Sequence, residues 1–113
     1  MMKKEFVTYE MAVKLKQLGF NEPCLKSYGI DGLLNMHDHE MYLSAPLFQQ
    51  AFRWFREKYD WTIEVNQVTK NNWSYTLKNF SKERMYYGGS YETFEVAEIA
   101  CLEKLIEFIE REK

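Results

Sequence analysis

The residues best suited to chemistry are the two histidines, His37 and His39, which alternate with Asp38 and Glu40. On an extended chain the two imidazoles point the same way, and imidazole with carboxylate is a donor set that suits zinc or iron. A complete site needs more ligands, and the sequence has no further histidine. We therefore interpret this segment as a polar loop and expect no metal and no other cofactor. A small metal-binding protein or enzyme that uses His37, Asp38 and His39 is kept as an alternative.

Other catalytic patterns are absent from the sequence. No Walker loop, no GxSxG or HExxH motif and no dinucleotide-binding fingerprint occurs. Cys24 and Cys101 have no base near them in the sequence, and Cys101 lies on an apolar helical face, which is typical of a small core residue. We therefore predict that the protein is not an enzyme and has no catalytic residues.

Composition and charge narrow the class of protein. The chain of 113 residues suffices for one domain, 1–113, and its aromatic content of 17% provides for a dense core. The formal net charge of −2 gives no positive excess that would attract phosphate. No apolar run is long enough for a membrane-spanning helix, and none follows the N-terminal lysines as a signal peptide requires. We expect a cytoplasmic protein without membrane contacts and with reduced cysteines.

The first half of the chain predicts one helix and two short strands. Thr8 caps a helix over residues 9–18, which Gly19 ends. Strands are expected over 24–28 and 33–36, joined by a hairpin turn at 29–32. The polar stretch 37–44 predicts a loop.

A second helix is predicted to begin at Pro46, because proline suits the first helical position. Apolar residues then alternate with polar ones over 61–66 and 73–78, which predicts a hairpin with its turn at 69–72. A third strand is expected over 84–87, before two glycines. The apolar stripe of the helix, at helical spacing, consists of Phe48, Ala51, Phe52, Phe55 and Tyr59.

The last helix is predicted over residues 94–110, with Thr93 as its cap. Its apolar arc is wide, which indicates packing on a sheet and on a further element or on a partner chain, so the sequence permits a homodimer. Glu98 falls inside this arc. Two interpretations stay open: a carboxylate at the sheet edge, favoured by the positive end of the helix dipole, or a buried acid with a raised pKa.

The order α-β-β-α-β-β-β-α predicts an α+β domain whose mostly antiparallel sheet has helices packed on one face. Trp61, Trp73 and Tyr75 are in phase with the aliphatic residues of the hairpin, so we expect their rings in the core. The opposite sheet face is expected to carry only polar residues, without a ring on which a base could stack.

Residues 46–110 form an α-β-β-β-α unit, the element order of a double-stranded-RNA-binding domain. Such domains carry a lysine cluster at the start of the final helix, where it spans phosphates. This sequence has Glu92, Glu95 and Glu98 there. A nucleic-acid-binding module of this topology is therefore an alternative, and we do not expect nucleic acid as the partner.

The predicted binding surface lies on the second helix. It consists of Gln49, Arg53, Trp54 and Arg56. Tryptophan and arginine are enriched at interface hot spots, which favours contact with another protein. The alternative interpretation is a solvent-exposed helix back with a tryptophan at its edge.

Three segments of the sequence are distinctive enough for comparison with known families. They are LGFNEPC from residue 18, APLFQQAFRWFREKY from residue 45 and YETFEVAEIACLEKLI from residue 91. On these strings the chain resembles a family of small uncharacterised proteins of gut Bacteroides-type bacteria and their prophages. The resemblance implies a mobile-element setting and transfers no activity and no functional residue. Together with the predicted surface, it leads us to expect a non-enzymatic accessory protein of phage or prophage type that binds another protein.

Overall fold

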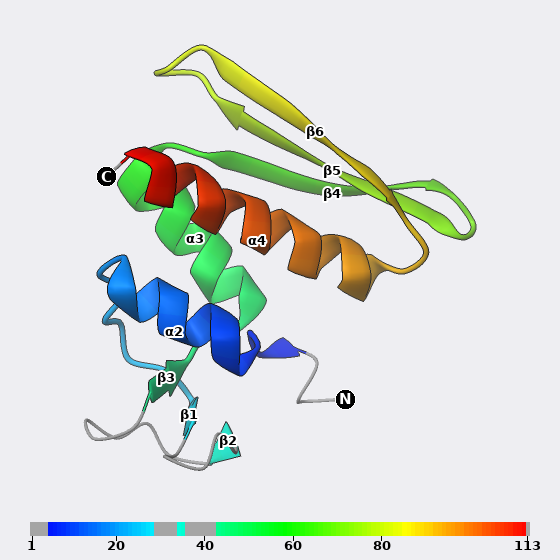
Figure 1. Cartoon of the computed structure of the whole chain (residues 1–113). Coiled ribbons are helices and arrows are strands. Elements are labelled where there is room, and N and C mark those ends of the chain that lie inside the picture. Colours follow the sequence, from blue (N-terminus) through cyan, green and yellow to red (C-terminus); the bar gives the residue numbers. More distant parts are fainter. Residues whose placement is uncertain (1–4, 29–33, 36–42, 113) are drawn as a thin grey trace.

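The computed structural model describes residues 5–28, 34–35 and 43–112. In this part of the chain, helices α2, α3 and α4 lie between a large and a small antiparallel sheet (Figure 1). The predicted α+β class and the predicted order of elements are confirmed, with one short strand, β3, added before α3. The described residues contain no helix that is long and apolar enough to cross a membrane.

The large sheet has the strand order β4-β5-β6 and contains the predicted hairpin. Its strands are β4 (Thr62–Thr69), β5 (Asn72–Asn79) and β6 (Arg84–Tyr91). The sequence predicted that the third strand ends before the two glycines, which is wrong. Strand β6 continues through them, and Gly88 lies directly against the ring of Tyr75, where a side chain would collide. The glycines therefore serve close packing here and not a turn.

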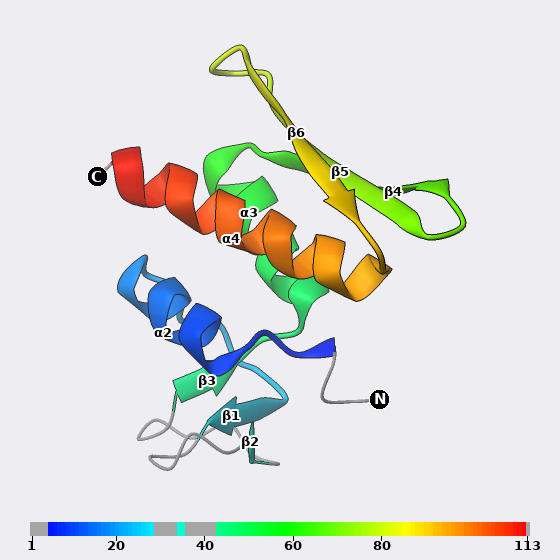
Figure 2. The ribbon, with the colours of Figure 1, turned by 45° about the vertical axis from the view of Figure 1, so that its right-hand side comes forward.

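Helices α3 (Phe48–Tyr59) and α4 (Phe94–Glu112) cover one face of the large sheet, as predicted (Figures 1 and 2). Helix α4 contacts all three strands, and α3 packs on α4 and β4. Two of the three rings expected in the core lie there: Trp61 is 1% exposed and stacks on Phe108, and Tyr75 is 2% exposed. Trp73 is only partly buried, and its ring meets that of Phe94 at the start of α4 edge to face at 5.4 Å. This confirms that the hairpin aromatics hold the helices to the sheet.

The start of α3 differs from the prediction. Leu47 is the N-cap and the helix begins at Phe48, so Pro46 lies outside the first turn. The carbonyl oxygen of Pro46 accepts a hydrogen bond from the amide of Val7 at 3.0 Å, and Phe6 forms a β-bridge with Leu47. Pro46 therefore pairs with the N-terminal segment before the helix begins.

The helix caps follow the prediction. The Thr8 hydroxyl accepts a hydrogen bond from the Met11 amide at 3.2 Å at the start of α2 (Tyr9–Gln17), and Gly19 has the positive φ of a helix end. The Thr93 hydroxyl accepts from the Val96 amide at 3.2 Å at the start of α4. Helix α4 extends two residues further than predicted, to Glu112, whose carboxylate pairs with Lys82 and Arg84.

The small sheet has the order β2-β1-β3, formed by β1 (Lys26–Tyr28), β2 (Leu34–Asn35) and β3 (Leu43–Ala45). The predicted loop is wrong at its last two residues, because Leu43 and Ser44 pair with β1. The predicted turn at 29–32 lies outside the described residues. The Tyr28 hydroxyl donates a hydrogen bond of 2.6 Å to the Val7 carbonyl, which ties β1 to the N-terminal segment.

Candidate functional site

Trp54, the aromatic member of the predicted binding surface, lies in the core. Its side chain is 7% exposed, and its ring meets those of Phe20, Phe55 and Tyr59 edge to face at 5.1 to 5.5 Å. The Lys58 ammonium covers the ring, 5.1 Å from its centroid. Trp54 therefore presents almost no surface to a partner. Gln49, Arg53 and Arg56 are exposed, as expected for a solvent-exposed helix back, but the tryptophan does not lie at an exposed edge of it.

The three polar members of the predicted surface separate into two groups. Arg53 faces the segment after α2, where its guanidinium lies 3.7 Å from the Glu22 carboxylate. Gln49 and Arg56 line hollows on the side of α3 that faces β4 and the start of α4. The structure thus brings Gln49 and Arg56 together and leaves Arg53 apart from them.

The largest hollow that we describe, about 540 Å³, lies where α3 and α4 begin. We call it the acidic pocket. Its walls combine apolar side chains with three carboxylates and one amide. They are formed by Glu5, Leu47, Phe48, Gln49, Phe94, Glu95 and Glu98. The residues come from the N-terminal segment and from the first turns of two helices, so tertiary packing alone brings them together.

A second hollow of about 230 Å³ adjoins the acidic pocket, since Gln49 and Phe94 line both. Its remaining walls come from α3 and β4: Phe52, Arg56, Ile63 and Val65. We call the two hollows together the α3 groove. It carries carboxylates at one end, the Arg56 guanidinium at the other and apolar side chains in between.

Glu98 is a buried acid, so the structure decides between the two interpretations of this residue. Its side chain is 6% exposed, and the Gln49 amide donates a hydrogen bond of 3.5 Å to its carboxylate. Burial raises the pKa of Glu98 to about 7; the Gln49 hydrogen bond opposes the increase, and the charges of Glu95 and Glu5 add to it. Near neutral pH this carboxyl therefore changes its charge.

We predict that Glu98 makes stability depend on pH. Its ordinary pKa of 4.5 rises to about 7 on folding, so the folded state holds this proton more tightly than the unfolded chain. The resulting stabilisation is fully present below pH 4.5 and is lost as pH rises towards 7, a loss of up to about 3 kcal/mol. Urea unfolding at several pH values checks this: Glu98→Gln gains stability relative to the wild-type protein as pH rises. A constant difference between the two proteins would contradict it.

The two cysteines are poorly placed for nucleophilic chemistry. Cys101 is buried in the core, where burial and the nearby Glu98 carboxylate raise the pKa of its thiol to about 12. The Cys24 thiol donates a hydrogen bond of 3.3 Å to the Glu22 carbonyl. Cys101 thus acts as a small core residue, as predicted.

The sequence segment His37 to Glu40 lies outside the described residues. Within residues 5–28, 34–35 and 43–112, no group of three or more histidines, cysteines or carboxylates could hold a metal ion.

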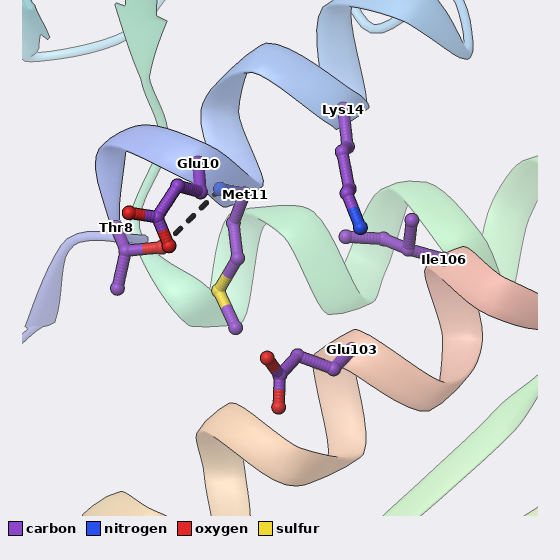
Figure 3. Close-up of a pocket in the computed structure, with 6 residues that line it drawn as sticks. All are labelled: Thr8, Glu10, Met11, Lys14, Glu103 and Ile106. Carbon is purple, nitrogen blue, oxygen red and sulfur yellow. Dashed lines mark hydrogen bonds between the residues drawn. The ribbon is translucent and has the colours of Figure 1, made fainter.

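A third hollow, between α2 and α4, is small at about 120 Å³. Figure 3 shows Lys14 of α2 and Glu103 of α4 pointing into the space between the helices, with Met11 and Ile106 beside them. Both signs of charge line this hollow, and little space is left. It is a seam between two packed helices.

The outer face of the large sheet carries a ring that the sequence analysis did not expect. Tyr87 of β6 pairs with Thr76, which alternates in β5 with the core residues Tyr75 and Leu77, and Tyr87 is 69% exposed. Its hydroxyl donates a hydrogen bond of 2.7 Å to the sulfur of Met85, which is also exposed. The expectation of a purely polar outer face is wrong because the register of β6 was not recognisable. A single exposed ring is still no platform for successive bases.

The sequence analysis singled out Gln49 and Glu98 for separate reasons and missed that they share one pocket. It also missed Glu5 and Phe94. No local signal marks these two residues, because they line the pocket only where the N-terminal segment and the start of α4 pack against α3. No family model, no curated protein and no solved structure matches the chain.

Proposed function

We propose that this protein is a non-enzymatic accessory protein that binds another protein through the α3 groove. The observation that carries the proposal is the pair of adjoining hollows, lined by apolar walls and by opposite charges at their two ends. A peptide segment, which carries apolar and charged side chains in sequence, is the kind of ligand that matches such a surface.

Two further observations fit a binding role. Burial raises the pKa of the Cys101 thiol, and the described residues of the groove walls include no serine, cysteine or histidine. The ionisable groups of the groove are Arg56 and the carboxylates of Glu5, Glu95 and Glu98, to which the proposal assigns contacts with the ligand. The phage or prophage setting comes only from the resemblance of the three strings and stays part of this proposal. So do the cytoplasmic location and the predicted lack of a cofactor.

Site-specific photocrosslinking tests the proposal. A benzoylphenylalanine residue replaces Gln49, at the centre of the groove, and in a matched variant it replaces Gln17, which is exposed on α2. After irradiation in a lysate of the organism that encodes the protein, we expect one adduct of defined mass from position 49 and none from position 17. Excess wild-type protein should compete for the partner and suppress the adduct from position 49. Excess Phe94→Ala protein, which lacks one apolar wall of the groove, should suppress this adduct less.

The same adduct from both positions, or none from position 49, would overturn the proposal. Mass spectrometry of the adduct identifies the partner, and titration of the purified partner against the wild-type protein and Arg56→Glu then measures the contribution of the groove's basic end. Arg56 is exposed, so its replacement should leave the fold intact.

A further inference from the structure

The acidic pocket contains unbalanced negative charge. Glu5, Glu95 and Glu98 come from the N-terminal segment and from α4, and no lysine, arginine or histidine of residues 5–28, 34–35 and 43–112 lines the pocket with them. Among the described residues, none of the three forms an ion pair. Elsewhere Glu22, Glu107 and Glu112 each lie against a basic side chain, whereas carboxylates such as Glu64 and Glu103 form no ion pair with a described residue either. The distinguishing feature of the pocket is therefore that three carboxylates line one hollow.

The pocket differs from the other hollows in size and in its walls. Its volume of about 540 Å³ falls in the range of about 300 to 1,000 Å³ that is typical of ligand sites. Three further hollows of the described residues measure about 120, 230 and 260 Å³. The Leu47, Phe48 and Phe94 side chains provide apolar walls next to the carboxylates, so the pocket matches a ligand that is apolar along its length and cationic at its end.

We propose that the acidic pocket binds a lysine or arginine side chain of the partner protein, with the aliphatic stem against Leu47, Phe48 and Phe94 and the cationic head at Glu98. This inference rests on the proposed function and names the chemistry of the partner. Long basic side chains pack in this way, with the stem along apolar surface and the head at a polar group. In this protein, Lys58 and Lys104 already lie over the rings of Trp54 and Tyr86.

Occupation of the pocket changes the protonation of Glu98. The groups that face its carboxyl are the Gln49 amide from α3, Glu95 from the same helix and Glu5 from the N-terminal segment. In the empty pocket burial keeps Glu98 largely protonated below pH 7. A bound cation favours the ionised form, so binding releases a proton and is stronger at higher pH.

The probe for this inference is lysine with an acetylated amino group and a methylamide, and the matched neutral probe is norleucine blocked in the same way. Each is titrated into the ¹⁵N-labelled protein while amide chemical shifts are recorded. We expect the lysine probe to shift the amides of Gln49, Glu95 and Glu98, with an affinity at least tenfold higher than that of the norleucine probe. Its affinity should rise about tenfold from pH 6 to pH 8, because the ionised fraction of a carboxyl with a pKa of about 7 rises by that factor.

Three variants separate the pocket from the general surface charge. Glu98→Gln should weaken the lysine probe at least fivefold and abolish the pH dependence. Glu103→Gln, an exposed position on the same helix, should change neither. The double variant Glu5→Gln and Glu95→Gln changes only exposed side chains, so it tests the pocket charge without risk to the fold, and it should also weaken binding.

Equal affinity for the two probes, shifts away from the pocket or unchanged binding in Glu98→Gln would overturn the inference. The experiments distinguish a failure of this inference from a failure of the proposed function. If position 49 crosslinks a partner and the lysine probe does not bind, this inference is wrong and the proposed function stands. If position 49 yields no adduct, the proposed function itself is wrong.

Discussion

Replacing Gly88 with alanine is expected to lower the free energy of unfolding by about 3 kcal/mol, because the new methyl group collides with a buried ring. A Cβ atom at this position would lie 2.0 to 2.5 Å from three atoms of the Tyr75 ring. That ring is held on both sides, since it stacks on Tyr86 and on Tyr91. It cannot move aside without disturbing β6 and α4. Thermal or urea unfolding measures the loss.

Gly89 provides the matched control one position further along the same strand. There a Cβ atom would meet the hydroxyl end of Tyr91 at 3.3 Å, and this flexible tip can shift by a few tenths of an ångström. Gly89→Ala should therefore cost less than about 1 kcal/mol. Equal stability of the two variants would show that the strand avoids the collision by a change of register.

Replacing Trp54 with alanine is expected to cost about 3 to 5 kcal/mol, since it removes a large buried ring and leaves a cavity. The ring joins Phe20, from the segment after α2, to Phe55 and Tyr59 of α3. Its loss therefore loosens the packing between these two parts of the chain. Urea unfolding with a spectroscopic probe of helix content checks the prediction.

Arg53→Ala is the control for Trp54, because the two residues are neighbours on α3 and only the arginine is exposed. Its one ion pair, with Glu22, lies at the surface, so its loss should change the free energy of unfolding by no more than about 0.5 kcal/mol. A Trp54→Ala variant as stable as Arg53→Ala would place this ring at the surface and restore it to the predicted binding surface.

The placement of Trp54 explains why a binding surface is difficult to predict from one sequence. Tryptophan and arginine side by side on a helix match the composition of an interaction hot spot. The same composition occurs where a helix edge is buried by a distant segment, and here Phe20 provides that cover. Helical spacing fixes the direction of a side chain relative to its own helix, but it does not show which segment packs over that face.

The sequence by itself determined the fold class and those helices and strands that have local signals. The helical spacing of apolar residues in α3, the alternation in β4 and β5 and the side chains of Thr8 and Thr93 at the helix starts are local signals. Each depends on residues only a few positions apart, and the structure confirms all of them. The inward orientation of Trp61 and Tyr75 follows from the same alternation, because successive side chains of a strand point to opposite faces.

Only the tertiary structure decided the rest. Strand β3 pairs with the edge of β1, the glycines of β6 lie inside the strand with Gly88 against a ring of β5, and Pro46 accepts a hydrogen bond from Val7 before the helix begins. The acidic pocket has the same origin: Glu5 and Glu98, far apart in the sequence, meet Gln49 where three segments converge. The raised pKa of Glu98 depends on removal of its carboxyl from water, and the packed fold brings that about.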